Sequence, residues 1–158
     1  MNRAIFDLDG HVALVTGGNG GLGLAMSKGL VKAGASIAIW GRNADKNAAA
    51  VAELTAMGGD VAAFTCDVTD ESSAAAAFQE TLGRFGKIDS CFANAGGSGV
   101  RGAFHTLSSD DWRTTVDLNV SSVITTFQLA TRFWLESKQS GKLIVTSSVA
   151  GLIGIPFA

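Results

Sequence analysis

Residues 12–23 read VALVTGGNGGLG, and this short stretch decides the fold. Its apolar, β-branched start predicts a strand that is buried on both faces. Three glycines, Gly18, Gly20 and Gly23, satisfy the G-x-G-x-x-G spacing, and a helix is predicted to begin at Leu22. Glycines at such a turn let a pyrophosphate approach the backbone, where free N–H groups and the helix dipole hold it. The stretch therefore predicts dinucleotide binding. The alternatives are a purely structural turn and a methyltransferase loop for a nucleoside cofactor.

The rest of the chain continues this alternation of strand and helix. Besides Val12–Thr16, strands are predicted over Ser36–Trp40, Val61–Thr65, Ile88–Ala93 and Lys142–Thr146. Helices are predicted over Leu22–Ala33, Ala44–Met57, Glu71–Phe85 and Asp110–Lys138. Such an alternation indicates right-handed βαβ units on a parallel sheet. We expect an α/β fold of the doubly wound Rossmann type, with strand order 3-2-1-4-5.

The ends of the predicted helices carry the expected local signals. Glycines suited to the left-handed position after a helix follow the first three helices: Gly34, Gly58 and Gly86. Side chains that can cap a helix start precede the second, third and fourth predicted helices: Asn43, Asp70, and Ser108 in a capping box with Asp111.

The last predicted helix is the longest and carries one continuous apolar stripe. Its members recur at three- and four-residue spacing: Trp112, Val116, Val120, Val123, Phe127, Ala130 and Trp134. Ile124, Leu129 and Phe133 make the stripe wider than a single contact with a sheet needs. Either the helix only packs on the sheet, or it also faces a partner subunit in a homodimer or homotetramer.

Composition narrows the class of protein. The 158 residues, 47% apolar and 16% charged, suit a single domain over residues 1–158. A net charge of −2 argues against nucleic acid as a partner. We find neither a secretory leader nor an apolar run that would span a membrane, so we expect a cytoplasmic protein. Cys66 and Cys91 are then predicted as buried thiols of a reducing compartment, and no metal site is predicted.

The end of the second predicted strand bears on the choice of cofactor. NAD sites usually place Asp or Glu there to bond the ribose 2′-hydroxyl, whereas this chain has Gly41-Arg42-Asn43. A carboxylate would repel a 2′-phosphate, and the Arg42 guanidinium can hold one with two parallel hydrogen bonds. NADP is therefore favoured over NAD. The alternatives for Arg42 are a solvated surface charge and a stack on adenine.

Thr16, Gly17, Gly21 and Gly23 also satisfy a T-G-x-x-x-G-x-G pattern. In this motif and in those that follow, the chain resembles the short-chain dehydrogenase/reductase family over nearly its whole length. The other matching motifs are Asp67-Val68, Asn94-Ala95-Gly96, Trp112 with Asp117-Leu118-Asn119-Val120, and Ser147-Ser148 with Gly151 and Pro156. Each motif alone is weak evidence for the family, but the order and spacing of all the motifs together are specific to it.

The resemblance implies a cofactor site and a catalytic pair. It assigns NADP, or else NAD, to Gly17, Asn19, Gly20, Gly21, Leu22, Gly23, Arg42, Asp67, Val68, Asn94, Ala95 and Gly96. It makes Ser148 the residue that bonds the substrate oxygen and Asn119 the support of a proton relay. The implied reaction is hydride transfer between the nicotinamide and a small-molecule alcohol or ketone. Asn19 counts against NADP, because NADP-preferring members often carry a basic residue in that loop.

Several of these residues also have structural alternatives. Asp67 could cap the turn that follows it, Asn94 could be a turn residue, and Asn119 could be a satisfied polar group in a helix. Ser147 is expected either on the cofactor side or as a cap of the backbone. A surface role is favoured for the remaining polar candidates, which are His11, Arg101 and His105.

The position of the family's proton donor raises a separate expectation. In the family a tyrosine follows the catalytic serine by thirteen residues, and a lysine follows the tyrosine by four. Counting thirteen residues from Ser148 leads beyond Ala158, and the sequence contains no tyrosine. We therefore expect the N-terminal part of a longer enzyme, inactive by itself. The alternative is a dinucleotide-binding fragment without turnover.

Overall fold

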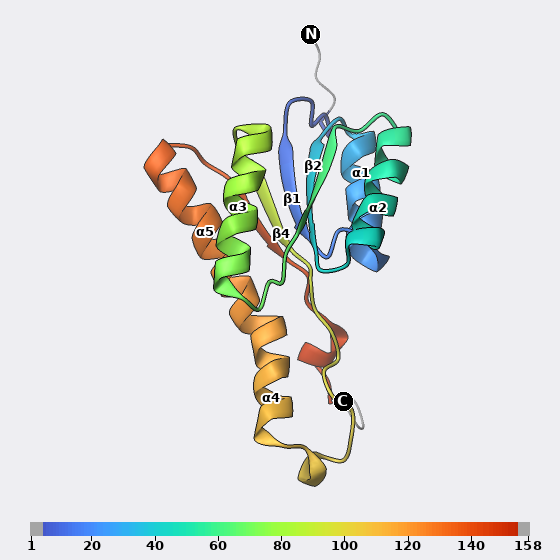
Figure 1. The fold of residues 1–158 in the computed structure, drawn as a ribbon, viewed down its shortest axis with the longest axis vertical. Coiled ribbons are helices and arrows are strands. Elements are labelled where there is room, and N and C mark those ends of the chain that lie inside the picture. The colour runs from blue at the N-terminus through green and yellow to red at the C-terminus, as the bar shows by residue number, and fades with distance from the viewer. Residues whose placement is uncertain (1–4, 155–158) are drawn as a thin grey trace.

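The computed structural model describes residues 5–154, which form one parallel five-stranded sheet. The strand order is β3-β2-β1-β4-β5, which confirms the predicted order (Figure 1). The strands are β1 (Val12–Thr16), β2 (Ser36–Gly41), β3 (Val61–Thr65), β4 (Ser90–Ala93) and β5 (Lys142–Val145). Pro156, the last residue of the predicted serine motif, lies outside the described residues.

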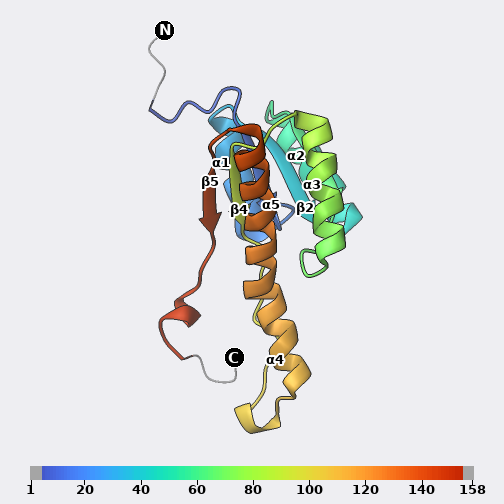
Figure 2. The same cartoon turned by 90° about the vertical axis from the view of Figure 1, so that its left-hand side faces the viewer.

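Helices cover both faces of the sheet, as the apolar strands require. On one face lie α1 (Gly21–Lys32) and α2 (Ala44–Ala56), and on the other lie α3 (Glu71–Phe85) and α5 (Ser122–Ser137) (Figure 1). Three shorter segments extend past the carboxyl ends of the strands (Figure 2): α4 (Ser109–Val116) and the 3-10 helices η1 (Phe104–Thr106) and η3 (Val149–Gly151). The Rossmann prediction is therefore confirmed.

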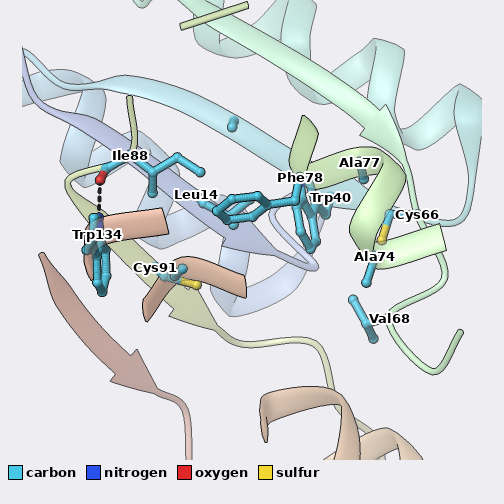
Figure 3. Close-up of a cluster of buried hydrophobic side chains, with 12 residues drawn as sticks. Leu14, Trp40, Cys66, Val68, Ala74, Ala77, Phe78, Ile88, Cys91 and Trp134 are labelled. Carbon is cyan, nitrogen blue, oxygen red and sulfur yellow. Dashed lines mark hydrogen bonds between the residues drawn. The ribbon is translucent and has the colours of Figure 1, made fainter. Parts of the chain in front are cut away.

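Successive strand residues supply two separate cores. Val15 packs with Leu54 in the core under α1 and α2. Leu14 and Trp40 pack with Phe78 in the core under α3 and α5 (Figure 3). The rings of Trp40 and Phe78 meet edge to face, with centroids 6.3 Å apart. The period-two alternation of a strand thus divides its side chains between the two helical layers.

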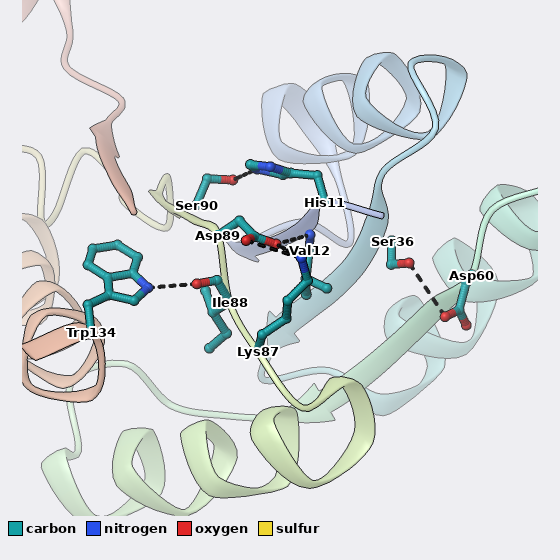
Figure 4. Close-up of polar contacts among 9 residues, drawn as sticks. All are labelled: His11, Val12, Ser36, Asp60, Lys87, Ile88, Asp89, Ser90 and Trp134. Carbon is teal, nitrogen blue, oxygen red and sulfur yellow. Dashed lines mark hydrogen bonds and ion pairs between the residues drawn. The ribbon is translucent and has the colours of Figure 1, made fainter. Parts of the chain in front are cut away.

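Polar side chains organise the amino ends of the strands (Figure 4). Asp89 accepts the Val12 N–H at 2.8 Å. The Ile88 carbonyl accepts the Trp134 indole N–H at 2.6 Å rather than a strand neighbour, and β4 begins at Ser90, later than predicted. His11, expected on the surface, is half-buried, and its Nε2 lies 2.9 Å from the Ser90 hydroxyl.

The predicted helix ends are confirmed. The glycines after the first three helices all have positive φ: Gly34 (98°), Gly58 (90°) and Gly86 (73°). The Asn43 side chain accepts the Lys46 N–H, and Asp70 accepts the N–H groups of Ser72 and Ser73. Ser108 and Asp111 form the predicted capping box.

The helix predicted over Asp110–Lys138 is present, but it is not a regular α-helix throughout. A π-helical turn, η2 (Asp117–Ser121), separates α4 from α5. The apolar stripe does not pack along its whole length either. Ala130 and Trp134 are buried, whereas Trp112 is 67% and Val120 is 50% exposed. The reason is that α4 projects past the sheet, so only α5 has a strand layer to cover (Figure 2).

Candidate cofactor and catalytic site

The predicted site residues follow the carboxyl ends of the strands. The glycine-rich loop (residues 17–23) follows β1, Arg42 follows β2, and Asp67 follows β3. Asn94 comes directly after β4. In an open α/β sheet this edge, where the strand order reverses, is the position at which ligands bind. The strand order places that reversal between β1 and β4.

The glycine-rich loop leaves its backbone accessible to an anion. Gly17 has a φ of 66°, and its N–H donates to the Trp40 carbonyl at 2.7 Å. A Cβ on Gly23 would lie 2.2 Å from the Gly17 carbonyl oxygen, so only glycine permits this approach of helix and strand. Gly20, the N-cap of α1, has no side chain to cap the helix, and the first turn carries no acidic residue. The N–H groups of that turn are therefore available to a phosphate.

Asn94 and Thr16 join the carboxyl ends of β1, β4 and β5. The Thr16 hydroxyl, on a 2% exposed residue, accepts the N–H groups of Asn94 (3.0 Å) and Ala95 (2.9 Å). The Asn94 side chain donates to the Thr16 carbonyl at 3.1 Å and accepts from the Thr146 hydroxyl at 3.0 Å. The amide of Asn94 is thus used within the protein, and the backbone of Ala95 and Gly96 continues along the sheet edge.

Asn119 lies in the π-helical turn and holds the loop after β4. Its Oδ1 accepts the Gly97 N–H at 3.1 Å, and its Nδ2 donates to the carbonyls of Gly97 (3.0 Å) and Thr115 (2.9 Å). A Cβ on Gly96 would lie 2.9 Å from the Asn119 Oδ1. Single π turns inside helices are frequent at functional sites, because the extra residue redirects a side chain. Here the turn directs Asn119 toward the Asn94-Ala95-Gly96 segment.

The carboxylate of Asp67 lies between a turn and an arginine. It accepts from the Thr69 hydroxyl at 2.7 Å and from the Thr69 N–H at 3.0 Å. Its Oδ2 lies 3.8 Å from the Arg42 guanidinium. The Thr69 hydrogen bonds, and more weakly Arg42, hold the pKa of Asp67 below its usual range. Val68 beside it is buried, so the pair presents one carboxylate and one apolar wall.

The two serines after β5 differ in their contacts. Ser148 is exposed, and its hydroxyl accepts the Ala150 N–H at 3.2 Å as the N-cap of η3. The backbone-capping role that was one expectation for Ser147 thus belongs to Ser148. Arg101 and His105, in the loop that joins β4 to α4, are exposed as expected.

Asn47 was missed by the sequence reasoning. It is 5% exposed in the first turn of α2, donates to the Gly41 carbonyl at 2.9 Å and accepts from the Asn19 Nδ2 at 2.7 Å. One signal could have found it. Asn47, Ala50 and Leu54 recur at helical spacing on the buried face of α2, so an amide occupies a position that periodicity assigns to the core.

Comparison with known proteins places the chain in a family. Residues 11–158 match the model of the short chain dehydrogenase family, and the chain belongs to that family. It is 34% identical over 150 residues to a 3beta-hydroxysteroid dehydrogenase of Mediterraneibacter gnavus, covering 95% of this chain and 54% of the relative. It is likewise 34% identical over 154 residues to a sorbose reductase of Candida albicans, covering 96% and 54%. The chain thus spans about half the length of these curated relatives.

Solved structures agree with this assignment. An NAD+-bound xylitol dehydrogenase superposes with a TM-score of 0.89 at 31% identity, covering 95% of this chain and 57% of that one. A 7α-hydroxysteroid dehydrogenase complexed with NADH and 7-oxo glycochenodeoxycholic acid gives a TM-score of 0.91 at 30% identity, with 99% and 60% coverage. The similar proteins are oxidoreductases, and these two structures contain NAD(H).

The described residues show neither a metal-binding cluster nor a membrane-spanning helix. Within residues 5–154, no group of three or more His, Cys, Asp or Glu side chains is placed to hold a metal ion. None of the helices in that range has the length and apolar character needed to cross a bilayer.

Proposed function

We propose that the chain forms the cofactor-binding part of an NAD(P)-dependent oxidoreductase that acts on a small-molecule alcohol or ketone. The observation that carries this proposal is the first turn of α1. Its N–H groups follow a left-handed Gly17, no acidic side chain lies in that turn, and the contact of Gly23 with Gly17 tolerates no Cβ. These features suit a pyrophosphate.

The residues present fit a nicotinamide dinucleotide that lies across the carboxyl ends of the strands. The backbone of residues 20–23 would hold the phosphates, and Asp67 with the backbone of Val68 would bind the adenine. Arg42 and Asn19 would lie at the adenosine ribose, and Asn94-Ala95-Gly96 would line the cleft toward the nicotinamide. The cofactor, when bound, supplies the hydride chemistry.

We propose NADP as the preferred cofactor, with NAD as the alternative. The support is the sequence Gly41-Arg42-Asn43 at the end of β2, which puts a 70% exposed guanidinium where NAD sites carry a carboxylate. Asp67, 3.8 Å away, would compete with a 2′-phosphate for Arg42. The exposure of both side chains keeps that competition weak, because water screens exposed ion pairs.

The catalytic roles fall to Ser148 and Asn119. The Ser148 hydroxyl would donate a hydrogen bond to the substrate oxygen, since it is exposed and its one described bond uses only an acceptor lone pair. Asn119 would support proton movement at the cleft from its place in the π-helical turn. The tyrosine that donates the proton in the family has no counterpart among the 158 residues. A dinucleotide-binding fragment without turnover is therefore the second candidate function.

Assembly and location complete the proposal. A homodimer or homotetramer would use the outer face of α5, where Ile124 is 53% exposed beside Phe127. We propose a cytoplasmic location. We also propose that nucleic acid is not a partner, because the net charge is −2. Light scattering on the purified protein would test the assembly, and a monomer at micromolar concentration would contradict it.

Calorimetric titration with NADP+ and with NAD+ tests the cofactor proposal. We expect NADP+ to bind more tightly by about tenfold or more, the usual effect of a charge-assisted contact. Tighter binding of NAD+ would overturn the preference, and no binding of either at millimolar concentration would overturn the function. Turnover of alcohols by a protein that binds cofactor would support the enzyme, and its absence would support the second candidate.

A further inference from the structure

A chain of two side-chain amides connects the glycine-rich loop to the end of β2. The Asn19 Nδ2 donates to the Asn47 Oδ1 at 2.7 Å, and the Asn47 Nδ2 donates to the Gly41 carbonyl at 2.9 Å. We call Asn19, Asn47 and the Gly41 carbonyl the amide relay. Its central member is buried, and its two ends lie where the adenosine ribose would bind.

The relay has a single consistent direction. A carbonyl only accepts hydrogen bonds, so Asn47 must present its Nδ2 to Gly41. Its Oδ1 then faces Asn19, which must present its own Nδ2 in return. One buried side chain therefore sets the orientation of a half-buried one. Asn19 keeps its carbonyl oxygen and one N–H for a ligand.

Gly41 is matched to the relay. A Cβ on Gly41 would lie 2.3 Å from the Asn19 Nδ2 and 2.5 Å from the Asn47 Oδ1, so the two amides occupy the space of its missing side chain. The Gly41 carbonyl also accepts the Cys66 N–H at 3.2 Å. The relay thus fixes the residue that directly precedes Arg42.

Stability alone does not account for Asn47. It occupies the buried face of α2 with Ala50 and Leu54, where a leucine would pack without any polar group to satisfy. A buried amide costs free energy unless all its partners are in place. A residue of this kind is suited to holding one particular geometry.

We propose that Asn47 is a positioning residue for cofactor selectivity. Through Asn19 and the Gly41 carbonyl, it fixes the position of the glycine-rich loop relative to Arg42. Both segments would lie beside the ribose 2′ position. This inference rests on the dinucleotide binding proposed above. It concerns how the two cofactors are told apart, because a two-bond contact between Arg42 and a 2′-phosphate depends on orientation.

The test is a set of titrations with NADP+ and NAD+ on purified variants. Asn47→Leu should weaken NADP+ binding about tenfold, the scale of a charge-assisted bond that loses its alignment, and NAD+ binding less than about threefold. Gly41→Ala keeps both asparagines but adds a Cβ that would displace their amides, so it should lower the selectivity in the same direction. The same substitution of Asn47 in an Asn19→Ala background should have a smaller effect on selectivity, because only the bond to the Gly41 carbonyl is then left to lose.

Asn43→Ala is the matched control, because Asn43 caps the same helix through the Lys46 N–H and does not touch the relay. It should lower the melting temperature without changing the ratio of the two dissociation constants. An equal loss for both cofactors, a ratio change shared by the control, or a loss of selectivity that is undiminished in the Asn19→Ala background would each overturn the inference. If Asn47→Leu fails to fold, Gly41→Ala decides. Failure of the unmodified protein to bind either dinucleotide would instead overturn the proposed function.

Discussion

Thr16 shows how one buried hydroxyl arranges the site. It accepts two backbone N–H groups from the start of the Asn94-Ala95-Gly96 segment and lies 3.4 Å from the Phe92 carbonyl. The segment is thereby anchored to β1, while the Asn94 amide reaches Thr146 at the end of β5. The side chains nearest the cleft are thus occupied in joining strands. The backbone and the less constrained side chains of Arg42 and Ser148 remain for ligands.

Arg42 carries the first prediction. Arg42→Ala should weaken NADP+ binding about 10- to 100-fold, because a hydrogen bond to a charged group contributes about 1.5–3 kcal/mol. NAD+ binding should change little. Calorimetric titration with both cofactors measures the difference. Arg113→Ala is the control, since Arg113 is an exposed arginine paired with Asp110 on α4. Equal losses for both cofactors would contradict a role in holding the 2′-phosphate.

At the scale of elements, the π-helical turn between α4 and α5 divides a helix that packs on the sheet from one that extends beyond it. α5 packs on the sheet through Ala130 and Trp134, whereas α4 reaches past the strands. The π-helical turn between them carries Asn119, whose bonds to Gly97 tie the helix to the loop after β4. A helix anchored at one end by packing and at its middle by polar bonds can present a side chain at the cleft.

The two glycines of α1 make a matched pair for the second prediction. Gly23→Ala should destabilise the protein by about 1–3 kcal/mol, because its Cβ would lie 2.2 Å from the Gly17 oxygen and force the strand and helix apart. Gly29→Ala meets no atom within 4 Å and should stabilise the helix by up to about 1 kcal/mol. Urea unfolding measures both, and similar changes in the two variants would refute the close contact. Gly23→Ala should also weaken dinucleotide binding.

The N-cap of α3 carries a prediction about pH. Hydrogen bonds from the Ser72 hydroxyl and from the N–H groups of Ser73 and Ser72 lower the pKa of Asp70 in the folded state. Its stabilising contribution is therefore complete above the unfolded pKa, about 3.9. It is lost as the pH falls through the lower folded value. Asp70→Asn keeps a capping oxygen without the titration, so the variant should lose less stability than the unmodified protein between pH 6 and pH 3. Parallel loss in urea unfolding at both pH values would contradict the assignment.

At the scale of the whole molecule, the sheet separates two cores that are each closed by a pair of helices (Figure 1). Both cysteines lie in the core under α3 and α5. β1, β2 and β4 are the interior strands, and β3 and β5 lie at the edges of the described sheet. Val145 on β5 is 53% exposed, whereas the residues of β1 are all buried. The backbone amide hydrogens of the interior strands should therefore exchange with solvent most slowly.

Thiol reactivity tests this arrangement. Burial raises the pKa of Cys91 to about 12 and that of Cys66 to about 11, so neither forms a thiolate near neutral pH. We expect the folded protein to show no thiol that reacts rapidly with a disulfide reagent at pH 8. In guanidinium both thiols should react, because the pKa of an exposed cysteine is about 8.5. A rapidly reacting thiol in the folded protein would show that this core opens locally.

The sequence by itself determined the order of elements, the strand order and the helix ends. The order of elements and the helix ends follow from local physics: short apolar, β-branched runs, glycines that adopt positive φ at Gly34, Gly58 and Gly86, and capping side chains such as Asp70. The strand order follows from the alternation of strand and helix, which is typical of a doubly wound sheet. The location of the glycine-rich loop also follows, since a strand, a glycine turn and a helix in succession leave few other geometries.

Tertiary structure decided what each site residue touches. The π-helical turn at Asn119 follows from tying a helix to the loop after β4, a contact across the fold that periodicity does not encode. Asn47 is paired with Asn19 across 28 positions of sequence, so no local pattern reveals the relay. Local turns occupy the side chains of Asp67 and Ser148 in ways that their motifs leave open. A hydrogen bond depends on distances of a few tenths of an ångström, and these are set only when all the layers pack together.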